Sequence, residues 1–142
     1  MKLDRIIVAV DGSENSLAAV AWAAGLAEAT GAEVVAVHAV GLLEQLDEGG
    51  APVATQPHRD EIQRQFEVTW CAPLDQASVR CRRLLRDGNP VSVLLAVADE
   101  EDADLLVLGS RGLGGYPEAL LGSTSTQVAQ HSSRPVTIVP SG

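Results

Sequence analysis

The sequence predicts an α/β fold, in which one doubly wound parallel sheet of five strands is covered by helices on both faces. Short apolar segments alternate along the chain with longer segments that carry helix signals, which is typical of a chain that repeatedly passes from strand to helix. The segments at residues 6–10 and 105–108 are apolar without interruption, as buried parallel strands must be. With 142 residues, the chain can bury a substantial core, and we expect a single domain over residues 1–142.

The amino-terminal part of the chain predicts two strands joined by a helix. Residues 5–10 form the first expected strand, and Ser13, just after it, is a plausible N-cap for a helix. Gly31 is placed to end that helix, and residues 33–39 have the composition of a second strand. Residues 41–57 contain prolines and paired glycines without a hydrophobic period, which indicates a loop.

The middle of the chain predicts a helix followed by an edge strand. Ile62, Phe66 and Trp70 recur every four residues, which is the spacing of an amphipathic helix, and Pro73 should end or kink it. Residues 78–85 alternate arginines with apolar residues, a pattern typical of a strand with one face in contact with water.

The carboxyl-terminal part predicts two more strands, each beside a helix. The turn at residues 88–90 opens a helix expected over residues 91–101, and its proline suits the first turn of that helix. The fourth strand is expected at residues 105–108, the last helix at residues 123–132 and the last strand at residues 135–139.

A glycine-rich loop after the fourth strand carries the strongest functional signal in the sequence. Its glycines stand at positions 109, 112, 114, 115 and 122, and hydroxyl residues follow at 123–126. Glycine permits tight turns and lets a ligand approach main-chain N–H groups closely. Because the N–H groups at the start of a helix attract anions, this strand, loop and helix start predict a phosphate site, with Ser123 as the expected N-cap.

The composition argues against several other classes of function. A net charge of −9 disfavours nucleic acid and anionic membranes as partners, since both bind through clusters of Lys and Arg. Lys2 is the only lysine, so the loop is not a phosphate loop of the Walker type. The sequence has no apparent signal peptide and no apolar stretch of membrane-spanning length, and we therefore expect a cytoplasmic protein.

The residue types that most often bind metals or carry out catalysis are scattered. Cys71 and Cys81 lack the spacing of a metal site and are expected to be buried thiols in a reducing compartment. His38, His58 and His131 are far apart in the sequence and do not predict a metal site. No nucleophile, general base or carboxylate pair stands out, so the sequence assigns no catalytic residue.

The spacing Gly109-x2-Gly112-x9-Gly122-Ser123 resembles the nucleotide-binding signature of the universal stress protein family, without insertion or deletion. The resemblance continues, in order, through Asp11-Gly12-Ser13 after the first strand, Val37-His38 at the end of the second, the turn at residues 88–90 and the closing segment at residues 134–140. It covers essentially the whole chain.

This resemblance implies a Rossmann-like sheet with the strand order 3-2-1-4-5 and a bound ATP, whose phosphates would bring any Mg²⁺. It places the first and fourth strands side by side where the winding direction reverses, the point at which open sheets bind ligands. The residues implied to bind the nucleotide are Ala9, Asp11, Ala39, Leu108, Gly109, Arg111, Gly112, Gly122, Ser123, Thr124 and Ser125.

Each of these residues also has a purely structural interpretation. Asp11 is implied to lie near the nucleoside, but an aspartate after a strand also forms Asx turns. Arg111 is implied to contact a phosphate, and the alternative is a solvated surface arginine. The apolar residues beside the base would otherwise be ordinary core, the glycines ordinary turn residues and the hydroxyl residues simple helix caps.

The function implied by the resemblance is that of an ATP-binding stress-response or signalling module, which forms a homodimer through the strand at residues 135–139. Three alternatives stay open. The pocket could take cyclic AMP instead, or the chain could be a slow ATP hydrolase of the nucleotide-α-hydrolase type, although no residue is apparent that would activate water. The third alternative is a structural dimer that binds no nucleotide, and the intact glycine motif argues against it.

Overall fold

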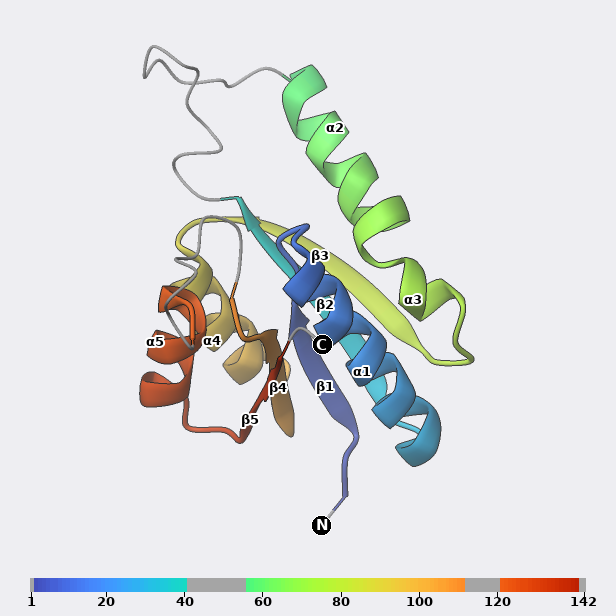
Figure 1. The fold of residues 1–142 in the computed structure, drawn as a ribbon, viewed down its shortest axis with the longest axis vertical. Helices are drawn as coiled ribbons and strands as arrows, with labels where there is room; N and C mark the ends of the chain where they lie inside the picture. Colours follow the sequence, from blue (N-terminus) through green and yellow to red (C-terminus); the bar gives the residue numbers. More distant parts are fainter. Residues whose placement is uncertain (1, 41–55, 112–120, 141–142) are drawn as a thin grey trace.

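Five parallel strands form one sheet in the order β3-β2-β1-β4-β5, which confirms the expected fold (Figure 1). The computed structural model describes residues 2–40, 56–111 and 121–140. The strands are β1 (Arg5–Ala9), β2 (Glu33–Val40), β3 (Cys81–Asp87), β4 (Leu105–Gly109) and β5 (Val136–Val139). The helices are α1 (Glu14–Thr30), α2 (Gln56–Gln65), the π-helix η2 (Phe66–Trp70), α3 (Ala72–Asp75), α4 (Pro90–Glu100) and α5 (Ser123–His131).

Helices cover both faces of the sheet, which explains why the central strands are apolar throughout (Figure 1). The side chains of these strands alternate between two cores. Ile6 and Val8 of β1 belong to the core beneath α1, η2 and α3, which we call the α1-side core. Ile7, between them, belongs to the core beneath α4 and α5, which we call the α4-side core.

The helix termini confirm the expected capping residues for α1. The Ser13 hydroxyl accepts a hydrogen bond from the Ser16 N–H (3.1 Å) at the start of α1. Gly31 ends the helix in the left-handed region (φ 79°), where its N–H donates to the Ala27 carbonyl (2.8 Å). At α4, the Asn89 side chain accepts from the Val91 N–H (2.9 Å), so the turn predicted at residues 88–90 supplies the N-cap.

The boundaries of three elements differ from the sequence prediction. β3 begins and ends later than the expected residues 78–85, because its register is set by pairing with β2, in which Val40 lies opposite Asp87. The helix expected through Trp70 continues to that residue, but its last five residues are π-helical, and Pro73 lies in the first turn of α3 instead. Most of the expected loop at residues 41–57 lies outside the described residues, and α2 begins before that range ends.

An ion-pair network lies at the amino end of the sheet. Arg82 of β3 donates to Glu33 of β2 (3.1 Å) and to Glu101 after α4 (2.7 Å), and Arg5 of β1 contacts the same two carboxylates. The arginines lower the pKa of Glu33 against the opposing effect of its burial, and the hydrogen bond from Arg82 is the main cause of the lowered pKa of Glu101. This network ties three strands and α4 together at the edge opposite the predicted ligand site.

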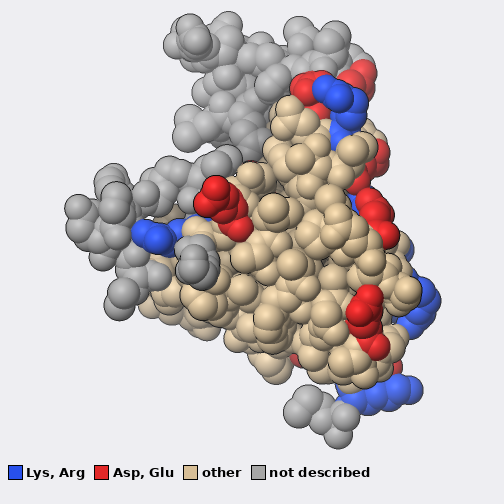
Figure 2. Space-filling model, turned by 45° about the vertical axis from the view of Figure 1, so that its right-hand side comes forward, with Lys and Arg blue, Asp and Glu red and all other residues tan. Residues whose placement is uncertain are grey.

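Charged residues of both signs share the surface. On the face seen in Figure 2, basic and acidic side chains lie near one another along the margin, around a broad area that carries few charges. In the part of the chain that the structure describes, no helix is both long enough and apolar enough to cross a membrane.

Candidate functional site

The carboxyl ends of β1 and β4 lie side by side at the centre of the sheet. The register places Val8 opposite Val107, so the residues that follow both strands leave the sheet at neighbouring points. From β1 the winding continues to β2 on one side, and from β4 it continues to β5 on the other. This is the switch point at which open parallel sheets bind ligands, and it brings the Asp11 turn close to the base of the glycine loop.

Asp11 holds the turn between β1 and α1. Its carboxylate accepts hydrogen bonds from the N–H (2.9 Å) and the hydroxyl (2.6 Å) of Ser13, which is an Asx turn. The Ser16 hydroxyl accepts from the Asp11 N–H (3.1 Å) and so ties the first turn of α1 back to the strand end. Asp11 therefore forms the Asx turn that was the structural alternative for this residue, and the turn fixes the position of its carboxylate.

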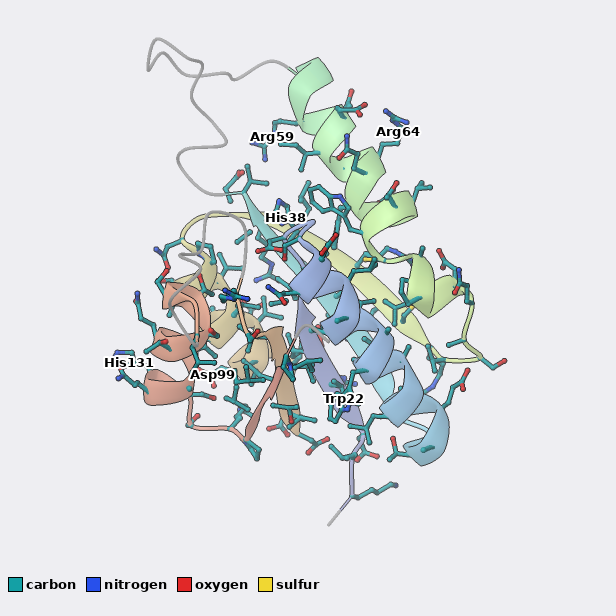
Figure 3. The ribbon with its side chains drawn as sticks, in the orientation of Figure 1. Trp22, His38, Arg59, Arg64, Asp99 and His131 are labelled. Carbon is teal, nitrogen blue, oxygen red and sulfur yellow. The ribbon has the colours of Figure 1, made fainter. Side chains whose placement is uncertain are left out.

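Aromatic side chains pack beneath the same turn. Gly12 has a φ of +86°, and a Cβ atom there would lie 2.7 Å from the indole ring of Trp70, so both its backbone and its surroundings require glycine. The ring of Trp70 meets His38 edge-on with the ring centres 5.0 Å apart. His38 Nδ1 lies 2.7 Å from the Val10 carbonyl oxygen, and because that oxygen can only accept, Nδ1 carries a proton. Trp70 and His38 thus support the end of β1 from the α1 side, and His38 is labelled in Figure 3.

Gly109 lets α1 approach the end of β4. A Cβ atom at this position would lie 2.7 Å from the carbonyl carbon and oxygen of Asn15, in the first turn of α1. Because these are backbone atoms, they have little freedom to move aside. Gly109 is therefore needed for the close contact between β4 and α1, whether or not a ligand is bound.

Ser110 closes the base of the glycine loop. Its N–H donates to the Val139 carbonyl (2.9 Å), which continues the ladder between β4 and β5. Its carbonyl oxygen accepts from the Gly122 N–H (2.6 Å) and from the Ser125 hydroxyl (3.0 Å) at the start of α5. These bonds hold the first turn of α5 beside the end of β4.

The hydroxyl residues of α5 divide into an inward and an outward group. Ser125 is only 2% exposed, and Thr126 donates its hydroxyl to the Gly122 carbonyl (2.8 Å), so both stabilise the helix start. Ser123 is exposed and Thr124 is half-buried. The N-cap is Gly122, one residue before the expected Ser123, and it makes no side-chain cap. The first N–H groups of α5 have no acceptor within the helix, as in any α-helix, and point outward from its start.

Three of the predicted residues share the α4-side face of the sheet near this edge. Ala9 and Ala39 are half-buried and pack against the α4-side core, of which Leu108 is a member. Arg111 is half-buried and directly follows Ser110. Gly112 lies outside the described residues, so its place in the site stays a prediction.

Two residues of this region were not indicated by any motif. Ser110 acts through its main-chain carbonyl, which any residue could supply. Asn15 contributes a side-chain oxygen, Oδ1, that is buried without a hydrogen-bond partner next to Gly109. An unpaired buried acceptor is costly, and it would be satisfied by a donor brought from outside the chain. A sequence search for polar residues in the first turn of α1 would have found Asn15, but not its contact with Gly109.

No metal centre is apparent among residues 2–40, 56–111 and 121–140, which contain no group of three or more His, Cys, Asp or Glu side chains able to hold an ion. The N–H donors at the start of α5 are suited to bind a phosphate group.

The strand order and the switch point between β1 and β4 define the class of protein. The chain is a doubly wound α/β protein, a class in which ligands bind at the carboxyl ends of the strands beside the switch point.

Within this class, the chain belongs to the universal stress protein family, whose family model matches residues 2–140. It is 34% identical over 134 residues to a universal stress protein of Thermus aquaticus, and the match covers 94% of this chain and 96% of the relative. A crystal structure of a universal stress protein in complex with cAMP is 28% identical, with a TM-score of 0.76 and coverage of 100% of both chains. A universal stress protein from Archaeoglobus fulgidus in complex with dAMP is 22% identical, with a TM-score of 0.72 and coverage of 98% of this chain and 99% of the other, and it has the same fold.

Proposed function

We propose that this chain is an adenine-nucleotide-binding universal stress protein that holds ATP at the carboxyl edge of β1 and β4 and acts as a stress-response or signalling module. The observation that carries the proposal is that the start of α5 is fixed beside the end of β4 by the bonds to the Ser110 carbonyl. The anion-binding end of a helix thereby lies at the ligand edge of the sheet.

The proposed roles follow from the positions of the side chains. The first N–H groups of α5, with the hydroxyls of Ser123 and Thr124, would donate to the phosphates, and Arg111 would add a charge-assisted contact. The adenine would lie over the face formed by Ala9, Ala39 and Leu108. The remaining residues with a proposed role are Asp11 toward the nucleoside, Gly109, Gly112 and Gly122 at the loop, and Ser125 at the helix start.

The ligands of the related structures support an adenine nucleotide. The relative that is 28% identical was solved with cAMP, and the Archaeoglobus fulgidus protein with dAMP. Both molecules combine adenine with a single phosphate group. ATP contains the same parts and two further phosphates, for which the start of α5 and Arg111 supply donors. Cyclic AMP is the second candidate, because the first of these relatives binds it.

We also propose a homodimer through β5. β5 is an edge strand of the sheet, with unpaired main-chain groups on its outer side, and α1 packs beside it. α1 exposes two large apolar side chains, Leu17 (44%) and Trp22 (42%), the second of which projects from the middle of the helix (Figure 3). A second copy of the chain would cover this strand edge and the apolar side chains beside it.

The nucleotide proposal is tested by calorimetric titration of ligand-free protein with ATP and Mg²⁺, and separately with cyclic AMP. Two variants probe the site, Gly122→Val and Ser123→Ala. Gly122 has φ −74° and ψ 169°, which any residue can adopt. The valine side chain therefore tests whether a ligand needs the space next to Gly122, and it does not test the backbone conformation. Ser92→Ala is the matched control, because Ser92 is an exposed serine in the first turn of α4.

We expect saturable binding by the wild-type chain and by Ser92→Ala, no binding by Gly122→Val, and affinity reduced about tenfold in Ser123→Ala. Absence of binding by the folded, ligand-free wild type would contradict the proposal for the nucleotide used.

ATP hydrolysis is tested in the same samples by measuring phosphate release. Asp11→Asn keeps an oxygen that can hold the Asx turn while removing the charge, so a loss of turnover in that variant would indicate a chemical role for the carboxylate.

A further inference from the structure

A cavity lies between the α2–η2 helix and the edge strand β3, away from the carboxyl ends of β1 and β4, which we call the nucleotide edge because the proposed nucleotide would bind there. Its volume is about 440 Å³, which is within the range of pockets for small organic ligands. β2 separates β3 from β1, so the cavity and the edge between β1 and β4 are separate places in the sheet. In Figure 3, Arg59 lies on the side of α2 that faces β3, and Arg64 points the opposite way.

The apolar part of the cavity lining is formed by Phe66 and Leu85. Phe66 of η2 is 1% exposed, and Leu85 of β3 is half-buried on the same face of the sheet, whereas the side chain of Leu84 packs on the opposite face, against the α4-side core. Phe66 also opens the π-helical segment, and π-helical turns are frequent at binding sites because they widen the helix locally. A ligand with an apolar body would displace water from this part of the lining and would be stabilised by the hydrophobic effect.

Two guanidinium groups line the same cavity. Arg59 donates through Nη2 alone to both carboxylate oxygens of Asp87 (2.8 and 2.9 Å). Arg83 donates through Nη2 to Asp75 (2.8 Å), and its Nη1 has only a sulfur contact with Cys81 (3.6 Å). The Nε atom of Arg83 is buried and has no hydrogen-bond partner. A guanidinium has five donors, so both groups have donors that their protein carboxylates do not use.

We propose that this cavity binds a small organic monocarboxylate with an apolar body, at a site separate from the nucleotide edge. The carboxylate would accept from the donors of Arg83 that its pair with Asp75 leaves unused, and a charge-assisted pair of this kind is stronger than a neutral hydrogen bond. Arg59, which pairs with Asp87 at the other end of β3, would add positive charge to the cavity. The body would lie against Phe66 and Leu85.

The charges around the cavity favour a ligand with one negative charge over a polyphosphate. Arg59 and Arg83 each already face one carboxylate, that of Asp87 and that of Asp75. Glu67 adds a further negative charge to the lining, where it accepts from Gln63 (3.2 Å). The partial neutralisation leaves hydrogen-bond donors available but little excess positive charge, which suits a monocarboxylate and disfavours ATP.

The test is a titration of ¹⁵N-labelled protein followed by amide NMR shifts, with phenylacetate as the probe. Phenylacetamide has the same body without the charge, and acetate has the charge without the body. We expect phenylacetate to shift the amide signals of η2 and β3 in a saturable way with a dissociation constant in the millimolar range, as is usual for so small a ligand. ATP with Mg²⁺ should leave those signals unchanged.

Variants identify the groups responsible. Arg83→Gln should weaken phenylacetate binding about tenfold or more, and Arg86→Gln should leave it unchanged. Arg86 is the matched control, because it belongs to the same strand but pairs with Glu100 of α4. Gln63 lines the cavity from the exposed surface of α2, so Gln63→Trp should block the cavity while leaving the core intact. If Arg83→Gln fails to fold, this variant tests whether phenylacetate binds in the cavity.

The proposal is overturned if phenylacetate gives no saturable shift, if its shifts lie outside η2 and β3, or if Gln63→Trp binds it as the wild type does. Equal binding of phenylacetamide would also overturn it, because the guanidinium groups would then play no part. None of these outcomes depends on nucleotide binding, which is measured independently.

Discussion

Replacing Gly109 with alanine tests the central junction of the fold, at which α1 meets the end of β4. The added Cβ atom would lie 2.7 Å from the carbonyl carbon and oxygen of Asn15, whereas ordinary contact begins at 3.4 Å. The two backbones would therefore have to separate by about 0.7 Å, the difference between these distances. Neither atom belongs to a side chain that could rotate away.

The expected cost follows from overpacking. Inserting a methyl group into closely packed surroundings costs about 1–3 kcal/mol of folding free energy. Alanine also restricts the unfolded chain, which offsets about 0.4–1 kcal/mol where the native backbone suits it. Gly109→Ala should therefore lower the free energy of unfolding by about 1–2 kcal/mol, which for a domain of this size lowers the melting temperature by about 3–7 °C.

Gly25→Ala is the matched control, since the same chemical change should there have the opposite sign. Gly25 lies inside α1, and a Cβ atom at that position would meet no atom within 4 Å. Alanine is favoured over glycine in a helix interior by about 1 kcal/mol, so this variant should melt above the wild type. Thermal unfolding and urea titration of the two variants measure the difference. If Gly109→Ala were as stable as Gly25→Ala, the close contact between β4 and α1 would not exist as described.

Two further predictions concern ionisable groups. Burial raises the pKa of Cys71 to about 11, whereas Cys81 is partly exposed. At pH about 8, iodoacetamide should therefore alkylate Cys81 in the native protein and leave Cys71 unmodified until the chain unfolds. Mass spectrometry measures the labelling, and equal labelling of both cysteines would contradict the prediction. The pKa values of Glu33 and Glu101 are lowered from about 4.5 by their arginine partners, so the stability they contribute is present above that pH and is lost as the pH falls below it. Arg82→Gln should reduce this acid-dependent loss in urea titrations at pH about 7 and about 3.5, whereas Arg59→Gln, at a separate ion pair, should not.

Local signals in the sequence predicted most of the fold. The cap residues Ser13 and Gly31 and the capping turn before α4 act as expected because capping depends on a few neighbouring residues. The bounds of β3 were wrong because strand register is decided by the partner strand, which a local pattern does not contain. The π-helical turn at η2 was missed for a related reason, since its spacing of apolar residues fits an α-helix equally well.

The candidate site was predicted in part, and the part that was missed involves contacts between segments distant in the sequence. The motif identified Gly109, but its spacing gives no sign that Asn15 lies against it. The burial of the unpaired Asn15 Oδ1 and the hydrogen bonds to the Ser110 carbonyl depend on how α1, β4 and α5 pack together. The cavity beside β3 was likewise not indicated, because Arg59 of α2 and Arg83 of β3 line the same cavity only when α2 packs over the edge strand.

The glycine motif combines two kinds of residue, and the distinction determines how variants should be interpreted. Gly109 and Ser125 hold α1 and α5 against the end of β4, whereas Ser123 and Thr124 lie where they could meet a ligand. A variant of the first kind should lose stability and nucleotide affinity together, because the helix start would no longer be fixed at the edge of the sheet. A variant of the second kind should lose affinity at unchanged stability. Measuring both quantities for Ser125→Ala and Ser123→Ala therefore separates residues that build the site from residues that are proposed to contact the nucleotide, which affinity alone does not do.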